Sequence, residues 1–433
     1  MNAFSRPLFR PLCCVLFLLA LIPGVVTSGL AQEPTDPKAM YRLGSQYYMG
    51  EGRAKDSAMA AKWFRASAEQ GYAPAQYIMG LMYQKGEGVQ RDDAVAVKWF
   101  EKAAMQGDAG AQRSLGYMYH NGFGVKKDHA EAVKWYRKAA EQGNLSAQRS
   151  LGNMYENGSG VEKDSAEAVK WFRMAADRGY APAQCDLGVS YRNGEGVEKD
   201  PAQAVAWFRK AADQGYATAQ HYMGVSYRNG EGVQKDHETA VQWFRKAAEQ
   251  GLPLAQHNMG VMTQFGRGVE KNLDVAVKWY RKAADQGFTQ SQNNLGLLYR
   301  NGTGVERDYA AAVAWFEKAA RQGNVSSQRH LAYMYDNGYG VKKNEAEAVK
   351  WYRKAADQGD AEAQYNIGRS YLNGSGVEKN AKEAVKWFTM AAEKGFPAAQ
   401  HALGQCYRQG IGVEKNEEEA AKWLKLADKN REK

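Results

Sequence analysis

The sequence lacks the short motifs that usually mark an enzyme active site. It contains no H-E-x-x-H, C-x-x-C, P-loop or G-x-S-x-G pattern, each of which encodes a recognisable chemistry. The seven histidines show no metal-ligand spacing. Catalysis needs polar groups that converge in a pocket, and nothing here predicts them. We therefore expect no catalytic, cofactor-binding or metal-binding residues, and an enzyme is the least favoured interpretation.

Long apolar runs are almost absent as well. The exception covers residues 12–26, follows two arginines and precedes small residues at 29–31. This order is typical of a secretory signal peptide and is too short to favour a membrane span. We predict a signal peptide at residues 1–31, cleaved after Ala31, with Ser28 as the rival site and an uncleaved anchor as the alternative. The mature chain is then expected to be secreted or periplasmic, without a membrane span.

What the chain does contain is one repeated unit. Every tryptophan in the protein stands 36 residues from the next, and no insertion or deletion disturbs this spacing. A fixed period between 20 and 50 residues indicates a stacked-repeat architecture. The eleven tryptophans are Trp63, Trp99, Trp135, Trp171, Trp207, Trp243, Trp279, Trp315, Trp351, Trp387 and Trp423.

Each unit is predicted to form two helices. In the unit that begins at Ala111, the first helix places apolar residues on one face at i, i+4, i+5 and i+8, and Gly122 ends it in a left-handed turn. Asp128 caps the second helix, and Glu131 is expected to complete a capping box with it. The second helix then has its own apolar face. The cap position is Asp or Asn in all eleven units.

A glycine recurs in the middle of the first helix, at Gly116 and nine equivalent positions; Ala332 is the exception. Glycine costs about 1 kcal/mol relative to alanine in a helix interior. We therefore expect another backbone or a tryptophan ring to approach closely there.

These features predict an all-α fold, an α/α superhelical solenoid of eleven 36-residue helix-turn-helix repeats. Residues 32–38 form a short linker, and residues 39–433 form an array in which each unit contacts only its neighbours. No second domain or low-complexity tract interrupts it. The units start at residues 39, 75, 111, 147, 183, 219, 255, 291, 327, 363 and 399.

Only two cysteines follow the predicted signal peptide, Cys185 and Cys406. They lie six units apart, which is roughly 60 Å if helices pack about 10 Å apart. A disulfide needs Cα atoms within about 7 Å. We therefore exclude an internal disulfide and expect both cysteines to be buried.

The consensus A-Q-x-x-L-G-x-x-Y-x-x-G-x-G-V-x-x-D-x-x-x-A-x-x-W-[FY]-x-x-A-A-x-x-G resembles the Sel-one-like repeat (SLR), a relative of the tetratricopeptide repeat. It is nearly complete at residues 147–179 and 363–395, and the resemblance covers residues 39–433. The resemblance implies a scaffold or adaptor for protein partners, bound chiefly on the concave face, without catalytic residues. Departures from the pattern are local and include Met40, Thr263 and Leu424.

The formal charge of +10 for the whole chain becomes +8 without the signal peptide. Much of the excess lies in the recurring K-W-[FY]-R-K of the second helix, which we interpret as a solvated face. Nucleic-acid binding would need stacking aromatics beside a basic stripe. The aromatic residues here are expected to be buried, so we predict no nucleic-acid partner.

A candidate partner-binding site follows from the positions that vary within the first helix. The residue after the motif tyrosine is arginine at Arg192, Arg228 and Arg300. Between them the pattern changes, and Phe265 replaces the usual Asn. We predict a groove for an acidic segment with an apolar anchor, formed by these arginines with Phe265, His221 and His257. The alternative is a solvated arginine row with Phe265 folded inward to replace the missing tyrosine.

The predicted function is thus a non-catalytic scaffold or adaptor that binds a protein partner. A carbohydrate- or cell-wall-binding module of the same fold is the alternative. Solenoids normally need polar caps at their ends, but Trp423, Leu424 and Leu426 lie in the last helix. We therefore expect either a monomer with a frayed end or a weak end-to-end dimer; the alternative is that the charged C-terminal tail suffices as a cap.

Overall fold

The computed structural model describes residues 34–431, and this part of the chain folds into 22 helices without a strand. The helices alternate between the two types predicted for each repeat. The first type, called A helices below, comprises α1 (Pro37–Met49), α3 (Ala73–Lys85), α5 (Ala109–Asn121), α7 (Leu145–Asn157), α9 (Ala181–Asn193), α11 (Ala217–Asn229), α13 (Pro253–Phe265), α15 (Thr289–Asn301), α17 (Val325–Asn337), α19 (Ala361–Asn373) and α21 (Pro397–Gln409).

The second type, called B helices, completes each repeat. It comprises α2 (Ser57–Glu69), α4 (Asp93–Met105), α6 (His129–Glu141), α8 (Ser165–Ala176), α10 (Pro201–Asp213), α12 (His237–Glu249), α14 (Leu273–Asp285), α16 (Tyr309–Arg321), α18 (Glu345–Asp357), α20 (Ala381–Glu393) and α22 (Glu417–Arg431). The predicted signal peptide, residues 1–31, lies outside the described residues. None of the helices described is both long and apolar enough to cross a membrane.

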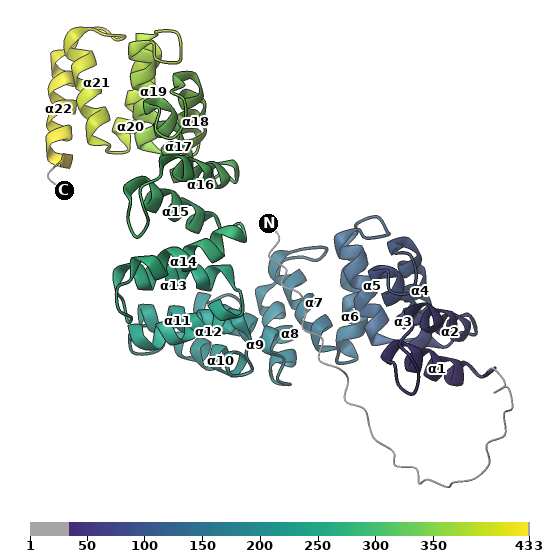
Figure 1. Cartoon of the computed structure of the whole chain (residues 1–433). Coiled ribbons are helices and arrows are strands. Elements are labelled where there is room, and N and C mark those ends of the chain that lie inside the picture. Colours follow the sequence, from purple (N-terminus) through teal and green to yellow (C-terminus); the bar gives the residue numbers. More distant parts are fainter. Residues whose placement is uncertain (1–33, 432–433) are drawn as a thin grey trace. The chain divides into compact units, whose positions relative to one another are not determined.

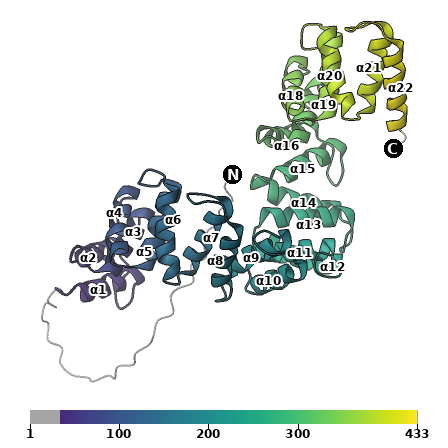
Figure 2. The same ribbon diagram turned by 180° about the vertical axis from the view of Figure 1, so that it is seen from behind.

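The chain divides into two compact units, one ending at Ala103 and the other beginning at Ala104, so the boundary falls within α4. Within each unit, the extensive contacts join helices that follow one another along the chain, first A to B within a repeat and then B to the next A. Figures 1 and 2 show this pairing from opposite sides. The all-α solenoid predicted from the 36-residue period is confirmed.

The helix ends follow the predicted signals, with one correction. Gly122 has φ 76° and caps α5, while the Asp128 carboxylate accepts a 2.9 Å hydrogen bond from the Glu131 backbone N–H at the start of α6. The predicted capping box is wrong in its second half. The Asp128 backbone N–H donates to the Tyr119 carbonyl, and the Glu131 carboxylate pairs with Lys134 at 2.8 Å. The A helix therefore satisfies the amide that the box would have used.

The mid-helix glycines make room for an aromatic ring, but not for the tryptophan. A Cβ atom on Gly116 would lie 2.8 Å from the ring of Tyr136, the residue after Trp135. The same position on Gly224 would lie 2.5 Å from Phe244. The expectation of a tryptophan ring at this contact is therefore wrong. Trp243 instead packs with a buried cluster that contains Phe208 of the preceding repeat and Met223 of its own repeat.

A buried glutamine chain ties successive repeats together. In the repeat of α11, Gln220 Nε2 donates to the Ala212 carbonyl at the end of α10, at 3.2 Å. Gln250, which follows α12, donates in turn to Gln220 Oε1 at 2.8 Å. Because a buried amide must find partners, these hydrogen bonds link the A helix both to the end of the preceding B helix and to the end of its own B helix.

Candidate partner-binding face

Three arginines occupy the same position near the C-terminal ends of α9, α11 and α15, and we call them the arginine row: Arg192, Arg228 and Arg300. All three side chains are half-buried. Each Nε lies within 3.3 Å of the side-chain oxygen of the following Asn, which orients the guanidinium along the face of the A helices. The structure thus confirms that the three residues are equivalent in position.

Each arginine reaches the A helix of the next repeat, 30 residues further along the chain. Arg228 Nη1 donates to Asn258 Oδ1 at 3.0 Å. The Arg300 Nη1 atom lies 3.3 Å from His330 Nδ1. Arg192 places its Cζ atom 4.7 Å from the centre of the Tyr222 ring. The sequence analysis missed these three partners, although all of them stand two residues after the motif glutamine.

The row carries positive charge without a directly paired carboxylate. None of its arginines forms an ion pair with another described residue. Two acids in adjoining loops, Glu195 and Glu231, accept hydrogen bonds from Asn193 and Asn229. Burial is the main cause that lowers the pKa of Arg228, because it penalises the charged guanidinium.

The two predicted histidines lie beneath the row. His221 is 4% exposed, and its Nδ1 lies 3.5 Å from Asn258 Nδ2. Burial, helped by the nearby Arg228 and Arg192, lowers its pKa to about 4. His257 places its Nδ1 2.9 Å from Ser291 Oγ, and burial likewise lowers its pKa to about 4. Both imidazoles are therefore neutral at pH 7; His221 is buried between repeats, whereas His257 is half-buried.

Phe265 points outward. Its side chain is 57% exposed, and the Arg267 guanidinium lies 5.3 Å from the ring centre. Thr263, which replaces the motif tyrosine, is buried and donates to the Met259 carbonyl at 2.7 Å. The alternative in which Phe265 folds inward is therefore wrong. The repeat of α13 consequently offers an apolar ring where its neighbours offer Asn229 and Asn301.

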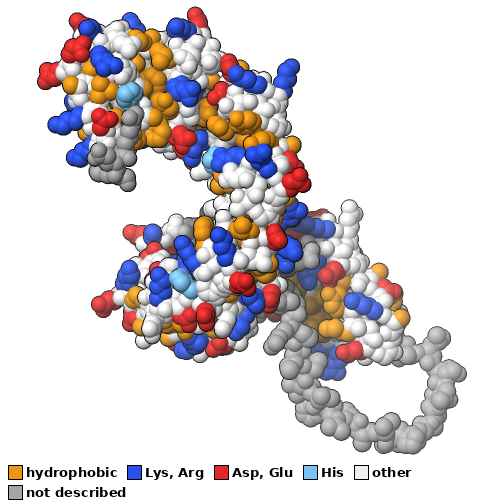
Figure 3. Space-filling model, turned by 60° about the vertical axis from the view of Figure 1, so that its left-hand side comes forward, with side chains coloured by type: hydrophobic (Ala, Val, Ile, Leu, Met, Phe, Trp, Pro, Cys, Tyr) orange, Lys and Arg blue, Asp and Glu red, His pale blue; other side chains and the backbone are white. Residues whose placement is uncertain are grey.

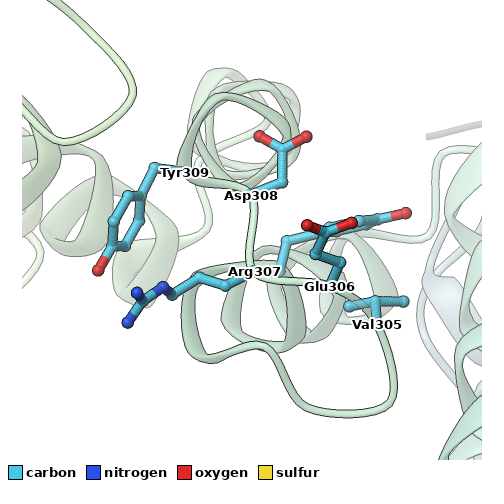
Figure 4. A pocket seen from close by; sticks show the side chains of 6 residues that line it. Val305, Glu306, Arg307, Asp308 and Tyr309 are labelled. Carbon is cyan, nitrogen blue, oxygen red and sulfur yellow. The ribbon is translucent and has the colours of Figure 1, made fainter.

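A pocket of about 610 Å³ lies in the loop that joins α15 to α16, in the repeat of Arg300. Figure 4 shows Arg307 and Tyr309 on one side of this loop and Asp308 directed away from them. The Arg307 guanidinium lies 5.5 Å from the Tyr309 ring centre, and Asp308 caps α16 through the Ala311 N–H. These side chains stabilise the loop and the start of α16, and they do not form a nucleophile–base pair.

No group of three or more His, Cys, Asp or Glu residues within 34–431 could hold a metal ion. Cys185 and Cys406 are both free and buried, as predicted. Figure 3 shows basic and acidic side chains interspersed over the visible surface, with hydrophobic side chains between them.

An uninterrupted series of paired helices with buried alanines, glycines and aromatics defines a helical-repeat solenoid. A model of the Sel1 repeat matches residues 37–72, 73–108, 109–144, 145–180, 181–216, 217–252, 253–288, 289–324, 325–360, 361–396 and 397–427. The chain therefore belongs to the Sel1 repeat family, whose members are typically non-catalytic scaffolds that bind proteins.

Solved structures agree with this assignment. The chain is 40% identical to c5321, a protective antigen with an SLR fold present in uropathogenic Escherichia coli strains, over 92% of this chain and 87% of that one, with a TM-score of 0.66. It is 34% identical to a Sel1 repeat protein from Oxalobacter formigenes, over 80% and 98% of the two chains, with a TM-score of 0.57. The comparison with curated proteins gave no match.

Proposed function

We propose that this protein is a secreted or periplasmic, non-catalytic scaffold that binds a protein partner through the concave face of its solenoid. The A helices would line this face, with Arg192, Arg228, Arg300 and Phe265 in contact with the partner. His221 and His257 would support the row from beneath. The observation that carries the proposal is the row itself: three half-buried guanidinium groups, aligned by the repeat and without a carboxylate partner of their own.

One of the comparisons supports an extracytoplasmic setting. The similar protein from uropathogenic Escherichia coli is described as a protective antigen, a description that fits a protein exposed outside the cytoplasm. The apolar run at residues 12–26 provides the matching export signal. Expression of the full chain in a Gram-negative host followed by N-terminal sequencing should give Gln32 as the first residue. A retained Met1 would contradict the proposed export.

Binding through the A-helix face can be tested by capture of envelope proteins on the purified chain. Arg192→Glu with Arg228→Glu should abolish capture of the specific partner, because like charges then face its acidic groups. The matched control is Lys199→Glu with Lys235→Glu, which makes the same charge change in exposed loops of the same two repeats. Equal capture by both double variants, with circular dichroism unchanged, would contradict the proposal.

A glycan array should be probed with the same variants. If glycans alone are retained and no envelope protein is captured, the chain is a carbohydrate-binding module and the protein-scaffold proposal fails.

A further inference from the structure

The A helices around the arginine row contain few acids. Among the described residues, α11, α13 and α15 contain no Asp or Glu. The one acid of α9, Asp186, is already paired with Arg149 at 2.5 Å. In the repeats on either side, the position equivalent to the row arginines is acidic: Glu156 on α7 and Asp336 on α17. The basic part of this face is therefore a bounded block of four repeats.

Within this block, Arg228 has only weak partners. Its guanidinium is half-buried and donates to the neutral side-chain oxygens of Asn258 and Asn229. Glu231 bonds to Asn229 and not to the arginine. A carboxylate forms shorter and stronger hydrogen bonds to a guanidinium than an amide does, and it can accept two at once. The block is therefore complementary in charge to a ligand that brings its own carboxylates.

The repeat also determines how far apart those carboxylates must be. Equivalent positions on neighbouring A helices lie about 8–10 Å apart, and an extended peptide advances about 3.3 Å per residue. Three residues of peptide therefore correspond to one repeat. Arg192 and Arg228 are one repeat apart, and Arg228 and Arg300 are two repeats apart, with Gln264 between them.

We propose that the row binds an extended acidic segment of the partner, with carboxylates at positions i, i+3 and i+9 and an apolar side chain at i+6. The apolar side chain lies against Phe265, which is exposed in the intervening repeat. If the segment runs in the opposite direction, its carboxylates stand at i, i+6 and i+9. This inference rests on the proposed function and adds the chemistry and spacing of the bound segment.

The test uses synthetic twelve-residue peptides and the full mature chain, with binding followed by fluorescence anisotropy. Two peptides carry three Glu and one Leu on a Gly/Ser background, with the spacing of one or the other chain direction. A third has the same composition with the three Glu adjacent. We expect one spaced peptide to bind about tenfold more tightly than the clustered one, and added salt to weaken it, because exposed ion pairs are screened within about 10 Å at 0.1 M.

Two variants check which arginines are used. Arg228→Gln should lower the affinity of the spaced peptide about tenfold. The affinity of Arg192→Gln for the same peptide tests a second arginine of the row, whose guanidinium lies over the Tyr222 ring. Arg408→Gln changes the same helix position in the last repeat and should leave binding unchanged. Loss of affinity in all three variants alike, or in none, would overturn the proposal.

The peptide result is independent of the partner-capture result. If clustered and spaced peptides bind equally while partner capture still depends on Arg192 and Arg228, the spacing is wrong but the scaffold function stands. If capture is also unaffected, both proposals fail.

Discussion

At the scale of single residues, one glycine and one arginine show how a repeat is packed and how repeats differ. Gly224 leaves space for the Phe244 ring, and it does so in the middle of a helix, where glycine itself is unfavourable. Arg228 shows the opposite situation, because a long charged side chain is held half-buried by neutral neighbours. Gly224 occupies a position that is glycine in nearly every repeat, whereas Arg228 occupies a position that varies between repeats.

Gly224→Ala should destabilise the protein by about 1–3 kcal/mol, although alanine is the better helix former, because the new methyl group would lie 2.5 Å from Phe244 Cδ1. The loss should stay moderate, since the repeat of α17 accommodates Ala332 at the same position. Urea unfolding followed by circular dichroism measures the change.

Gly404→Ala is the matched control for this substitution, because its neighbour in the last repeat is Leu424 and not a ring. It should cost less than the change at Gly224. An equal or larger loss at Gly404 would contradict the role assigned to the aromatic ring.

At the scale of helices, the glutamine chain decides how well one repeat joins the next. Three repeats lack the usual glutamine at the position of Gln250. In the last repeat, Asn430 still donates to Gln400 Oε1 at 3.1 Å, whereas the other two repeats have Arg178 and Lys394. Arg178 donates to the Gly143 carbonyl at 2.6 Å and Lys394 to the Gly359 carbonyl at 2.8 Å. As a result, the buried Oε1 atoms of Gln148 and Gln364 have no hydrogen-bond partner in the described part of the chain.

Arg178→Gln should therefore stabilise the protein by about 1 kcal/mol, because an unsatisfied buried acceptor gains its donor. A glutamine can reach both acceptors, as Gln286 does when it donates to Gln256 Oε1 at 2.9 Å and to the Gly251 carbonyl at 3.0 Å. Thermal unfolding compares the variant with wild type.

Arg178→Ala provides the reference for that comparison, since it removes the bond to Gly143 without supplying a donor to Gln148. It should be less stable than wild type. A glutamine variant no more stable than the alanine variant would refute the argument.

At the scale of the whole molecule, the repeat makes the ends different from the interior. Phe388 is 1% exposed and packs in a buried cluster with Leu403 and Cys406 of the next repeat. In the last repeat, the equivalent residue, Leu424, is only half-buried. In a nearest-neighbour array, a terminal repeat has one stabilising interface where an interior repeat has two.

Hydrogen exchange should consequently be faster in α22 than in α12, because local opening at the end breaks one interface only. Mass spectrometry of exchanged peptides at low protein concentration measures this difference directly. Protection of α22 that increases with protein concentration would instead support the proposed end-to-end dimer through Trp423. Equal protection of both helices at every concentration would contradict both expectations.

The sequence by itself determined the repeat, the helices and their caps. These features depend on local order: apolar spacing along one helix, an Asp or Asn before it and a glycine after it. They need no knowledge of where the neighbouring repeat lies. The three arginines could be selected on the same basis, since equivalent positions in a repeat occupy equivalent places.

Only the tertiary structure decided which groups meet across repeats. The mid-helix glycine faces the residue after the tryptophan, His221 is buried beneath the arginines, and Phe265 points outward. The partners of Arg228 and Arg300 stand 30 residues away. These contacts depend on the angle and offset between packed helices, which the side chains of both helices fix together. A single repeat therefore specifies its own two helices, and its neighbours decide which of its polar side chains remain free to bind a partner.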